Sequence, residues 1–209
     1  YEIISSAYQG AGIKPGDVKF KDIHKDGTID SKDRKHVGSS IPKFTLGLNL
    51  SAEWKGFDIS AFFQGAYGHK IYNQILTDNE GFYRGFNVTK RYYDNRWTET
   101  NPSNEYPRAS WKAKSNNARV STRFLENASY TRLKNLQIGY TFKTNQWKVD
   151  RLRIYLAATN LFTLTKYSGF DPEMTVSANS SGEGDRANGI DWGTYPACRT
   201  YTFGVNLTF

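Results

Sequence analysis

The sequence predicts an all-β fold, namely a section of a transmembrane β-barrel with about five long antiparallel strands. Residues 199–209 (RTYTFGVNLTF) alternate apolar and polar side chains without interruption. This stretch has the length that a tilted strand needs to cross a bilayer. The same alternation recurs in four earlier stretches, two within 44–66 and two within 124–162. Such repetition favours a sheet of membrane-spanning strands over a single half-buried strand.

The lengths of the connections give a further indication of a barrel. The turns near residues 55 and 146 are short, whereas the connections over 68–123 and 163–198 are long. In outer-membrane barrels the short turns share the periplasmic side and the long loops share the extracellular side. Because about eight strands are the minimum for closure, five strands are expected to be the C-terminal segment of a larger barrel.

Composition and charge exclude two other classes of protein. The chain of 209 residues is 38% hydrophobic, its mean hydropathy is −0.67, and no window approaches about 18 consecutive apolar residues, so it is no helical membrane protein. The net charge is +8, but the basic residues are scattered among acids and form no nucleic-acid-binding stripe. Basic loops can also face an anionic surface, such as phosphorylated lipid. Cys198 is the single cysteine, which rules out a disulfide framework.

The first region, 1–43, is expected to be an extracellular loop that contains a cation-type motif. Residues 22–33 place acids at positions 1, 5, 9 and 12 of a twelve-residue loop, with Gly27 at position 6. This spacing is typical of a calcium loop and predicts a Ca²⁺ (or Mg²⁺) site. His24 at position 3 departs from the pattern, because a hard cation prefers oxygen. The alternative is a solvated Asp-Gly turn held by its own hydrogen bonds. The ligands would be Asp22, Asp26, Thr28, Asp30 and Asp33.

Residues 44–66 predict a hairpin, and 67–123 predict a long extracellular loop. Trp54-Lys55-Gly56-Phe57 is a tight turn with an aromatic residue on each side, typical of a periplasmic turn with an aromatic girdle. The loop contains too many aromatic residues for disorder, and we expect short helical turns near 88–97. Packing within the loop and stacking on a sugar both explain these aromatics.

Residues 124–162 predict a second hairpin, in which two cations break the pattern. Arg132 and Lys134 share the parity of the apolar positions that follow them, which is unfavourable in a bilayer. Either the two long side chains extend to the membrane edge, or a β-bulge exchanges the faces at this point.

The chain is expected to finish with an extracellular loop over 163–198 and a terminal strand over 199–209. Asp171 and Glu173 form a carboxylate pair by proximity alone, and we interpret them as loop charges. No nucleophile motif such as G-x-S-x-G occurs, and His24, His36 and His69 form no recognisable ligand set. The sequence therefore predicts no enzyme and no catalytic residue.

Six motifs in a fixed order carry a resemblance to a known family. They are Pro15 to Asp22, the Asp-Gly loop through Arg34, Lys55 to Gly65, Arg132 to Leu136, Asn160 to Thr163, and Gly189 to Pro196. Together with a terminal phenylalanine, this set closely resembles the C-terminal part of SusC/RagA-type TonB-dependent outer-membrane transporters of Bacteroidetes. The similarity covers almost the whole chain and is weakest over 72–120 and 173–188.

The resemblance implies a 22-strand barrel closed by an N-terminal plug, of which this chain supplies about the last five strands. It also implies import of a glycan fragment or an oligopeptide with a SusD-like surface lipoprotein as lid. Energy would come from the TonB complex, through an absent N-terminal part. Phe209 would serve as the barrel-assembly signal. The family's acidic loop reads Asp-x-Asn-x-Asp-Gly, so His24 is a departure from it. Loop aromatics that would contact ligand or lid are Tyr83, Tyr92, Trp97, Trp111 and Trp192.

A different class of protein competes with this interpretation. A secreted, soluble β-sandwich that binds carbohydrate would use the aromatics for sugar and the loop over 22–33 for structural calcium. It explains the alternation, but it does not explain the strand lengths, the odd strand number or the contrast between short and long connections.

Overall fold

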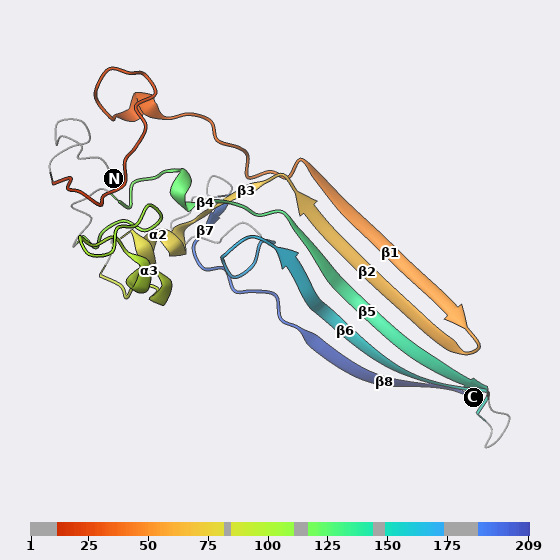
Figure 1. The fold of residues 1–209 in the computed structure, drawn as a ribbon. Helices are drawn as coiled ribbons and strands as arrows, with labels where there is room; N and C mark the ends of the chain where they lie inside the picture. Colours follow the sequence, from red (N-terminus) through yellow and green to blue (C-terminus); the bar gives the residue numbers. More distant parts are fainter. Residues whose placement is uncertain (1–11, 82–84, 111–116, 144–148, 174–187) are drawn as a thin grey trace. The chain divides into compact units, whose positions relative to one another are not determined.

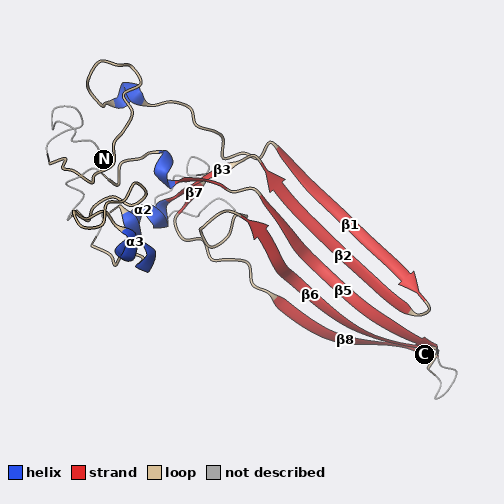
Figure 2. Cartoon of the chain, in the orientation of Figure 1, coloured by secondary structure: helices blue, strands red, loops and turns tan. Residues whose placement is uncertain are grey.

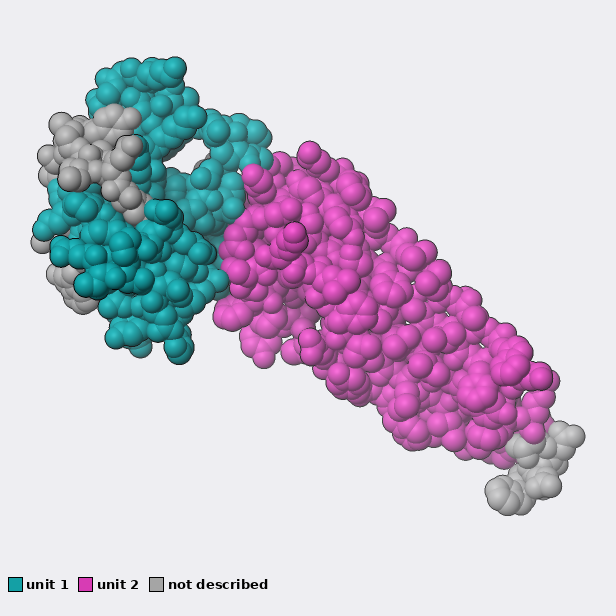
Figure 3. Space-filling view, viewed as in Figure 1, with its two compact units in different colours: residues 1–38, 72–125, 190–193 teal, residues 39–71, 126–189, 194–209 magenta. Residues whose placement is uncertain are grey.

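The computed structural model describes residues 12–81, 85–110, 117–143, 149–173 and 188–209. The chain divides into two compact units. Unit 1 comprises residues 1–38, 72–125 and 190–193, and unit 2 comprises the rest (Figure 3). No helix in the described part of the chain is long and apolar enough to span a membrane.

A five-stranded antiparallel sheet forms most of unit 2, in the order β1–β2–β5–β6–β8 (Figures 1 and 2). The prediction of five long antiparallel strands is confirmed. The strands are β1 (Phe44–Trp54), β2 (Phe57–Tyr67), β5 (Tyr130–Lys143), β6 (Arg151–Thr165) and β8 (Thr200–Thr208).

The register of the sheet gathers apolar side chains on one face. One row across all five strands is Ala52, Ile59, Ile138, Leu156 and Phe203. The neighbouring row is Ser51, Ser60, Gln137, Ala157 and Thr202, and it lies on the opposite face because successive side chains alternate. Leu156 and Phe203 are 63% and 66% exposed. In a soluble sandwich such an apolar face would be covered by a second sheet. We call the apolar side the outer face and the polar side the inner face.

Aromatic residues mark both ends of the outer face. Near the short turns, Phe57 packs against Tyr140 with ring centroids 4.4 Å apart. At the other end, Phe44 stacks on Tyr67 at 5.1 Å. Phe44 and Trp54 are the two ends of β1, ten residues apart, which is about 33 Å along a strand. At the usual tilt this spans about 25 Å of membrane thickness, the height of a barrel's apolar band.

The first hairpin turn has the geometry that its sequence predicts. Lys55 and Gly56 both have positive φ, 48° and 91°, as a two-residue type I′ turn requires. This turn matches the right-handed twist of the flanking strands, so β1 and β2 pair without a bulge over their full length.

Unit 1 contains short helices joined by irregular chain. The helices are η1 (Ser31–Asp33), α2 (Gln74–Glu80), α3 (Lys90–Asn95) and η3 (Thr122–Phe124). Asn73 caps α2 and Thr89 caps α3, each accepting a hydrogen bond from a first-turn N–H. Helix α3 confirms the helical turn expected near 88–97. A small sheet has the order β4–β3–β7, formed by β4 (Leu125–Asn127), β3 (Lys70–Asn73) and β7 (Ile190–Asp191).

Candidate functional site

A double bulge in β5 and β6 explains why Arg132 and Lys134 occur at positions where the sequence pattern calls for apolar residues. On β5, Lys134 is an extra residue between the paired Leu133 and Asn135. On β6, Asn160 and Leu161 are extra residues between Thr159 and Phe162. One extra residue exchanges the faces of β5 at this point. Leu133 therefore lies on the outer face and Arg132 on the inner face. Of the two alternatives, the bulge is confirmed.

The bulge presents Arg132 to a cluster of polar groups in which Arg132 and Asp171 are buried and Glu173, Lys134 and Thr163 are partly exposed. Its Nη2 lies 2.5 Å from Oδ1 of Asp171, and its Nη1 lies 2.8 Å from Oε2 of Glu173. Its Nε donates to the Thr163 hydroxyl at 2.7 Å. Lys134 Nζ also reaches Glu173, at 2.7 Å. We call Arg132, Lys134, Asp171 and Glu173 the clamp. It joins the bulged strand to the segment that follows β6.

Asp171 extends the clamp to the segment before β8. Its Oδ2 accepts the Ala197 N–H at 3.0 Å, and its Oδ1 accepts the Glu173 N–H at 2.9 Å. Burial alone raises the pKa of Asp171, but the hydrogen bonds from Arg132 and these two N–H groups outweigh it and hold the pKa below its usual value. Both ends of the second long connection are thus tied to one ionised carboxylate.

His69 lies beside the clamp and is itself buried. Burial lowers the pKa of His69, and a hydrogen bond to the backbone of Pro172 opposes this in part. Its ring meets Tyr130 edge-on, with centroids 6.5 Å apart. Nδ1 of His69 is buried and has no hydrogen-bond partner among the described residues. The neutral imidazole is therefore the form that this position accommodates.

Two glycines make room for large side chains on the inner face nearer the short turns. Arg153 donates to both carboxylate oxygens of Asp58, through Nε at 3.0 Å and through Nη2. A Cβ on Gly139 would lie within 3.0 Å of both groups, and one on Gly204 would meet the Tyr155 ring equally closely. The Arg153 guanidinium lies 4.9 Å from the Tyr155 ring centroid. On the inner face, Gly139 therefore leaves space for the Asp58–Arg153 ion pair, and Gly204 leaves space for the Tyr155 ring.

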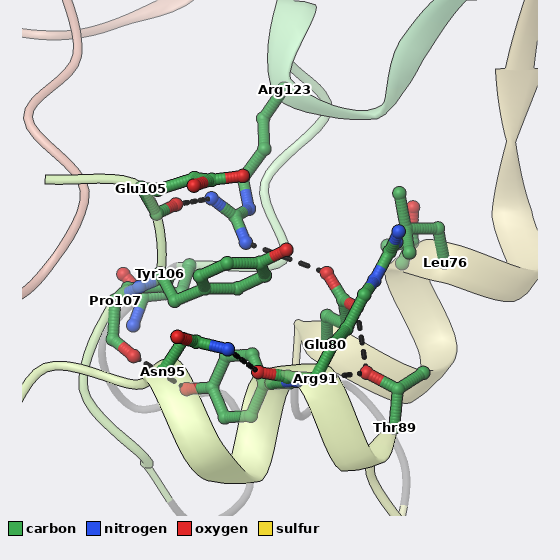
Figure 4. A network of polar contacts seen from close by, with 12 residues as sticks. Leu76, Glu80, Thr89, Arg91, Asn95, Glu105, Tyr106, Pro107 and Arg123 are labelled. Carbon is green, nitrogen blue, oxygen red and sulfur yellow. Dashed lines mark hydrogen bonds and ion pairs between the residues drawn. The ribbon is translucent and has the colours of Figure 1, made fainter. Parts of the chain in front are cut away.

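Unit 1 is held together by a buried carboxylate, Glu80 (Figure 4). Its Oε1 accepts from Arg91 Nε at 2.9 Å and from the Thr89 hydroxyl at 2.8 Å. Arg123 lies 3.7 Å from its second oxygen and donates to the Glu105 carbonyl at 2.6 Å. Three segments of the first long connection therefore meet at this acid, and a fourth, at Glu105, is joined to it through Arg123, which gives the connection a fixed core.

A second cluster in unit 1 explains the Pro-Gly-Asp motif. Asp17 accepts hydrogen bonds from Arg108 at 2.9 Å and from Asn117 at 3.1 Å. Gly16 has φ of +86°, and a Cβ there would collide with the ring of Trp97. Only glycine fits both the left-handed backbone and this close approach.

The loop over 22–33 does not support the predicted Ca²⁺ or Mg²⁺ site. Asp22 accepts the N–H groups of Lys25 and Gly27. Asp33 accepts those of Ile23, His24 and Asp30, and these bonds lower the pKa of Asp33. Within the described ranges, no three His, Cys, Asp or Glu side chains are grouped to hold a metal ion. The carboxylates bond to the loop's own backbone, as in the Asp-Gly turn that was the alternative. Asp26 and Asp30 likewise accept the N–H groups of Thr28 and Lys32.

The predicted loop aromatics occupy different environments. Tyr92 is completely buried and donates to the Pro107 carbonyl at 2.7 Å, which identifies it as a core residue rather than a ligand contact. Trp97 packs on Gly16, whereas Trp192 is 42% exposed. Tyr83 and Trp111 lie outside the described residues. Phe209 follows β8 and is exposed.

Sequence reasoning missed three groups: the clamp, the Asp58–Arg153 pair and the Glu80 network. Only the clamp could have been suspected from the sequence, because Arg132 and Lys134 occupy positions that the alternation assigns to apolar residues. Asp58 and Arg153 lie 95 residues apart, and only the strand order brings them together.

Comparison with known proteins identifies the fold. No family model matches the chain. TonB-dependent receptor P3 of Formosa agariphila is 34% identical over 200 residues, which cover 93% of this chain and 19% of the receptor. TonB-dependent receptor SusC of Bacteroides thetaiotaomicron is 26% identical over 201 residues, 94% of this chain and 18% of SusC.

Solved structures agree with these relatives. The structure of the RagAB peptide transporter superposes with a TM-score of 0.71 and 30% identity, covering 93% of this chain and 20% of that chain. The RagAB peptide importer in the open-open state gives a TM-score of 0.67 and 29% identity, covering 88% of this chain and 19% of that chain. The chain thus spans about one fifth of the length of the relatives it matches.

These relatives are receptors and transporters, which confirms the expectation that the chain is not an enzyme. Its five strands are a section of a transmembrane β-barrel of the outer membrane. The chain belongs to the SusC/RagA-type TonB-dependent outer-membrane transporters.

Proposed function

We propose that the chain is part of an active importer that takes up an oligomeric nutrient, a glycan fragment or an oligopeptide, across the outer membrane. A SusD-like surface lipoprotein closes the barrel from outside, and the TonB complex supplies energy through a plug elsewhere in the transporter. One observation carries the proposal: a chain similar to TonB-dependent receptors presents a long sheet with an apolar outer face and a polar inner face.

The two faces have different roles in this proposal. The outer face contacts lipid, because its apolar side chains are exposed and aromatic residues mark both of its ends. The inner face lines the lumen, where neutral groups such as Ser60, Gln137 and Thr202 offer hydrogen bonds to a polar ligand.

The topology follows from the connection lengths. Residues 1–43, 67–123 and 163–198 are extracellular, while the turns of the hairpins 44–66 and 124–162 are periplasmic. The terminal strand 199–209 then ends on the periplasmic side, where Phe209 can act as the assembly signal.

The clamp holds both ends of the connection over 163–198, the third of the proposed extracellular segments, against the barrel wall. Because Asp171 accepts from both Arg132 and the Ala197 N–H, the segments that enter and leave this connection are fixed together. A lid or a ligand would then meet a preformed surface, which lowers the ordering cost of binding. Trp192 keeps the exposure that such a contact requires.

Uptake by whole cells tests the proposal. A strain that lacks the transporter should accumulate less labelled oligosaccharide, or less labelled oligopeptide, than its complemented parent. Loss of TonB should have the same effect on the same nutrient. The nutrient class that depends on both proteins is the imported one. Uptake of both classes that is unchanged by the deletion would contradict the proposal.

Two further experiments test the lipoprotein lid and the contact of Trp192 with ligand or lid. Affinity purification of the transporter in mild detergent should retain a surface lipoprotein, and recovery of the transporter alone would argue against the lid. Trp192→Ala should lower uptake severalfold if Trp192 contacts ligand or lid. Tyr201→Ala is the matched control, since Tyr201 is an exposed aromatic of the outer face and should leave uptake unchanged.

A further inference from the structure

Phe62 is a large apolar side chain on the otherwise polar middle of the inner face. It pairs with Asn49 on one side and Asn135 on the other, two residues along β2 from Ser60, so it projects from the inner face. A Cβ on Gly47 of β1 would lie 3.6 Å from the Phe62 ring, which shows that the ring reaches across this face toward β1. Phe62 is 39% exposed. Because apolar surface in water is unfavourable, a partner in the lumen that covers this ring would stabilise it.

The polar groups around Phe62 are available to such a partner. Two neighbouring rows of the inner face form what we call the mid-wall patch: Phe62, Asn49, Asn135, Ser51, Ser60 and Gln137. Apart from Phe62, each member carries an amide or a hydroxyl group that can both donate and accept hydrogen bonds. Within the described part of the chain, the side chains of these polar members form no hydrogen bond with another residue. The patch therefore combines one exposed ring with unused donors and acceptors.

The mid-wall patch is neutral, although the chain carries a net charge of +8. In the strand register, the nearest guanidinium groups on the inner face are those of Arg132 and Arg153, and they already pair with Asp171 and Asp58. An ion would lose its hydration at the patch without gaining a counter-charge, which is costly. The patch accordingly fits an uncharged ligand that is rich in hydrogen-bonding groups.

We propose that the mid-wall patch binds an uncharged sugar residue of the imported oligomer, an inference that rests on the proposed import function. Phe62 contacts the CH face of the sugar, because the face of an aromatic ring is electron-rich and attracts C–H groups. The surrounding amides and hydroxyls exchange hydrogen bonds with the sugar hydroxyls. A peptide segment has one backbone donor and one acceptor per residue, and its side chains would meet a wall with a single apolar contact. A sugar therefore fits the patch better.

The rest of the transporter is the competing occupant of the lumen, because about four fifths of the length of the relatives lies outside this chain. A permanent interface is predominantly apolar at its centre and resembles a domain core. The mid-wall patch has one apolar side chain, Phe62, and its other members are polar. This composition is typical of a site that binds and releases a ligand.

The test is the binding of neutral oligosaccharides by the complete transporter, purified in mild detergent and incubated with a size-fractionated digest of uncharged polysaccharides. Native mass spectrometry gives the amount bound per protein. Phe62→Ala should reduce this amount severalfold, and Phe62→Tyr, which keeps the ring, should reduce it little. Phe63→Ala is the matched control, because it removes the same ring from the next residue, on the outer face, and should bind the wild-type amount.

Three results would overturn the inference. The first is that the wild-type transporter binds none of the oligosaccharides, and the second is equal binding by Phe62→Ala and the wild type. In the second case, a lower thermal midpoint of ligand-free Phe62→Ala would assign the patch to another part of the transporter. The third is binding of peptides from a tryptic digest instead of sugars, with a loss in Phe62→Ala.

Uptake in the same strains separates this inference from the proposed function. If import by wild-type cells depends on the transporter and on TonB while Phe62→Ala binds and imports normally, only the mid-wall site is wrong. If deletion of the transporter leaves all uptake unchanged, the proposed function is wrong as well.

Discussion

Arg132 and Asp171 form a buried ion pair of 2.5 Å although they lie 39 residues apart in the chain. The pair exists because one extra residue in β5 turns Arg132 from the lipid side to the inner side of the sheet. A bulge in a barrel strand thus converts a position that is unfavourable in lipid into an anchor for the connection that follows β6.

Arg132→Met should release both segments that Asp171 holds. Removal of one partner leaves a buried carboxylate uncompensated, which typically costs about 3–5 kcal/mol. Hydrogen exchange at the Ala197 amide should then be roughly a hundredfold to a few thousandfold faster, at about 1.4 kcal/mol for each factor of ten. Lys134→Met is the control, because it removes a cation from the same clamp but leaves Arg132 paired with both acids. Equal protection of Ala197 in Arg132→Met and the wild-type protein would contradict the role of the clamp.

Acidification should loosen the chain around His69 before it affects Asp171. The pKa of His69 is below its usual value of about 6.5, so neutral His69 contributes stability that is present above that pH and is lost as pH falls through the folded pKa. The pKa of Asp171 is also lowered, from about 3.9, so its contribution is lost only at more acidic pH.

Hydrogen exchange at the Ala128 amide, which donates to the His69 carbonyl at 3.1 Å, reports this change. After correction for the intrinsic rate, protection should fall between about pH 7.5 and about pH 5. His69→Gln, which stays neutral, should abolish the dependence. A dependence that persists in His69→Gln would show that another group titrates.

Asn160 should tolerate glycine better than alanine. It has φ of 50°, a left-handed conformation that costs most residues about 1–2 kcal/mol but is accessible to asparagine and glycine. Its side chain also donates to the Cys198 carbonyl at 3.0 Å. Both variants lose that bond, and only Asn160→Ala adds backbone strain. The thermal unfolding midpoint of the purified transporter should therefore fall in the order wild type, Asn160→Gly, Asn160→Ala. A lower midpoint for glycine than for alanine would refute the strain argument.

Gly204→Ala should destabilise the sheet, whereas Gly47→Ala should not. A Cβ on Gly204 would lie closer than 3.0 Å to the Tyr155 ring, but one on Gly47 meets Phe62 at an ordinary 3.6 Å. Removal of the obstructing ring in Tyr155→Ala/Gly204→Ala should restore part of the loss measured in the thermal midpoint. No restoration would mean that Gly204 serves the backbone of β8 rather than the space for Tyr155.

The strands could be predicted from the sequence because each one depends on the alternation of neighbouring side chains along the chain. Most outer-face side chains are apolar and most inner-face side chains are polar or small, so period-two alternation predicts the sheet directly, with Phe62 as an exception on the inner face. The turn at Lys55-Gly56 could also be predicted, because Gly56 adopts positive φ readily, although Lys55 is not among the residues that favour the first position of such a turn.

The clamp and the inner-face ion pair could not be read in this way. The sequence shows that Arg132 lies at an apolar position, but it does not show its partners. These depend on the path of the connection that follows β6. Asp58 meets Arg153 only because β5 lies between β2 and β6 and has glycine at position 139.

For two features, the sequence predicts a ligand contact where the structure shows bonds and packing within the chain. These features are the loop over 22–33 and Tyr92. The acids of residues 22–33 have calcium-loop spacing, but short carboxylates also fit the loop's own N–H groups, and that is where they bond. The sequence places Tyr92 in a long polar loop and therefore predicts a residue that contacts ligand or lid. The loop has its own core, and the burial of Tyr92 raises its pKa.

The most direct test of the barrel wall is the accessibility of spin labels at neighbouring positions in the complete transporter. Single cysteines at Leu156 and Phe203 on the outer face, and at Ala157 and Thr202 on the inner face, can be labelled in a Cys198→Ser background and reconstituted in bilayers. Labels at 156 and 203 should collide mainly with lipid-soluble oxygen, and labels at 157 and 202 mainly with a water-soluble nickel chelate. Equal accessibility to the nickel chelate at all four positions would show a sheet in water on both sides and would contradict the barrel.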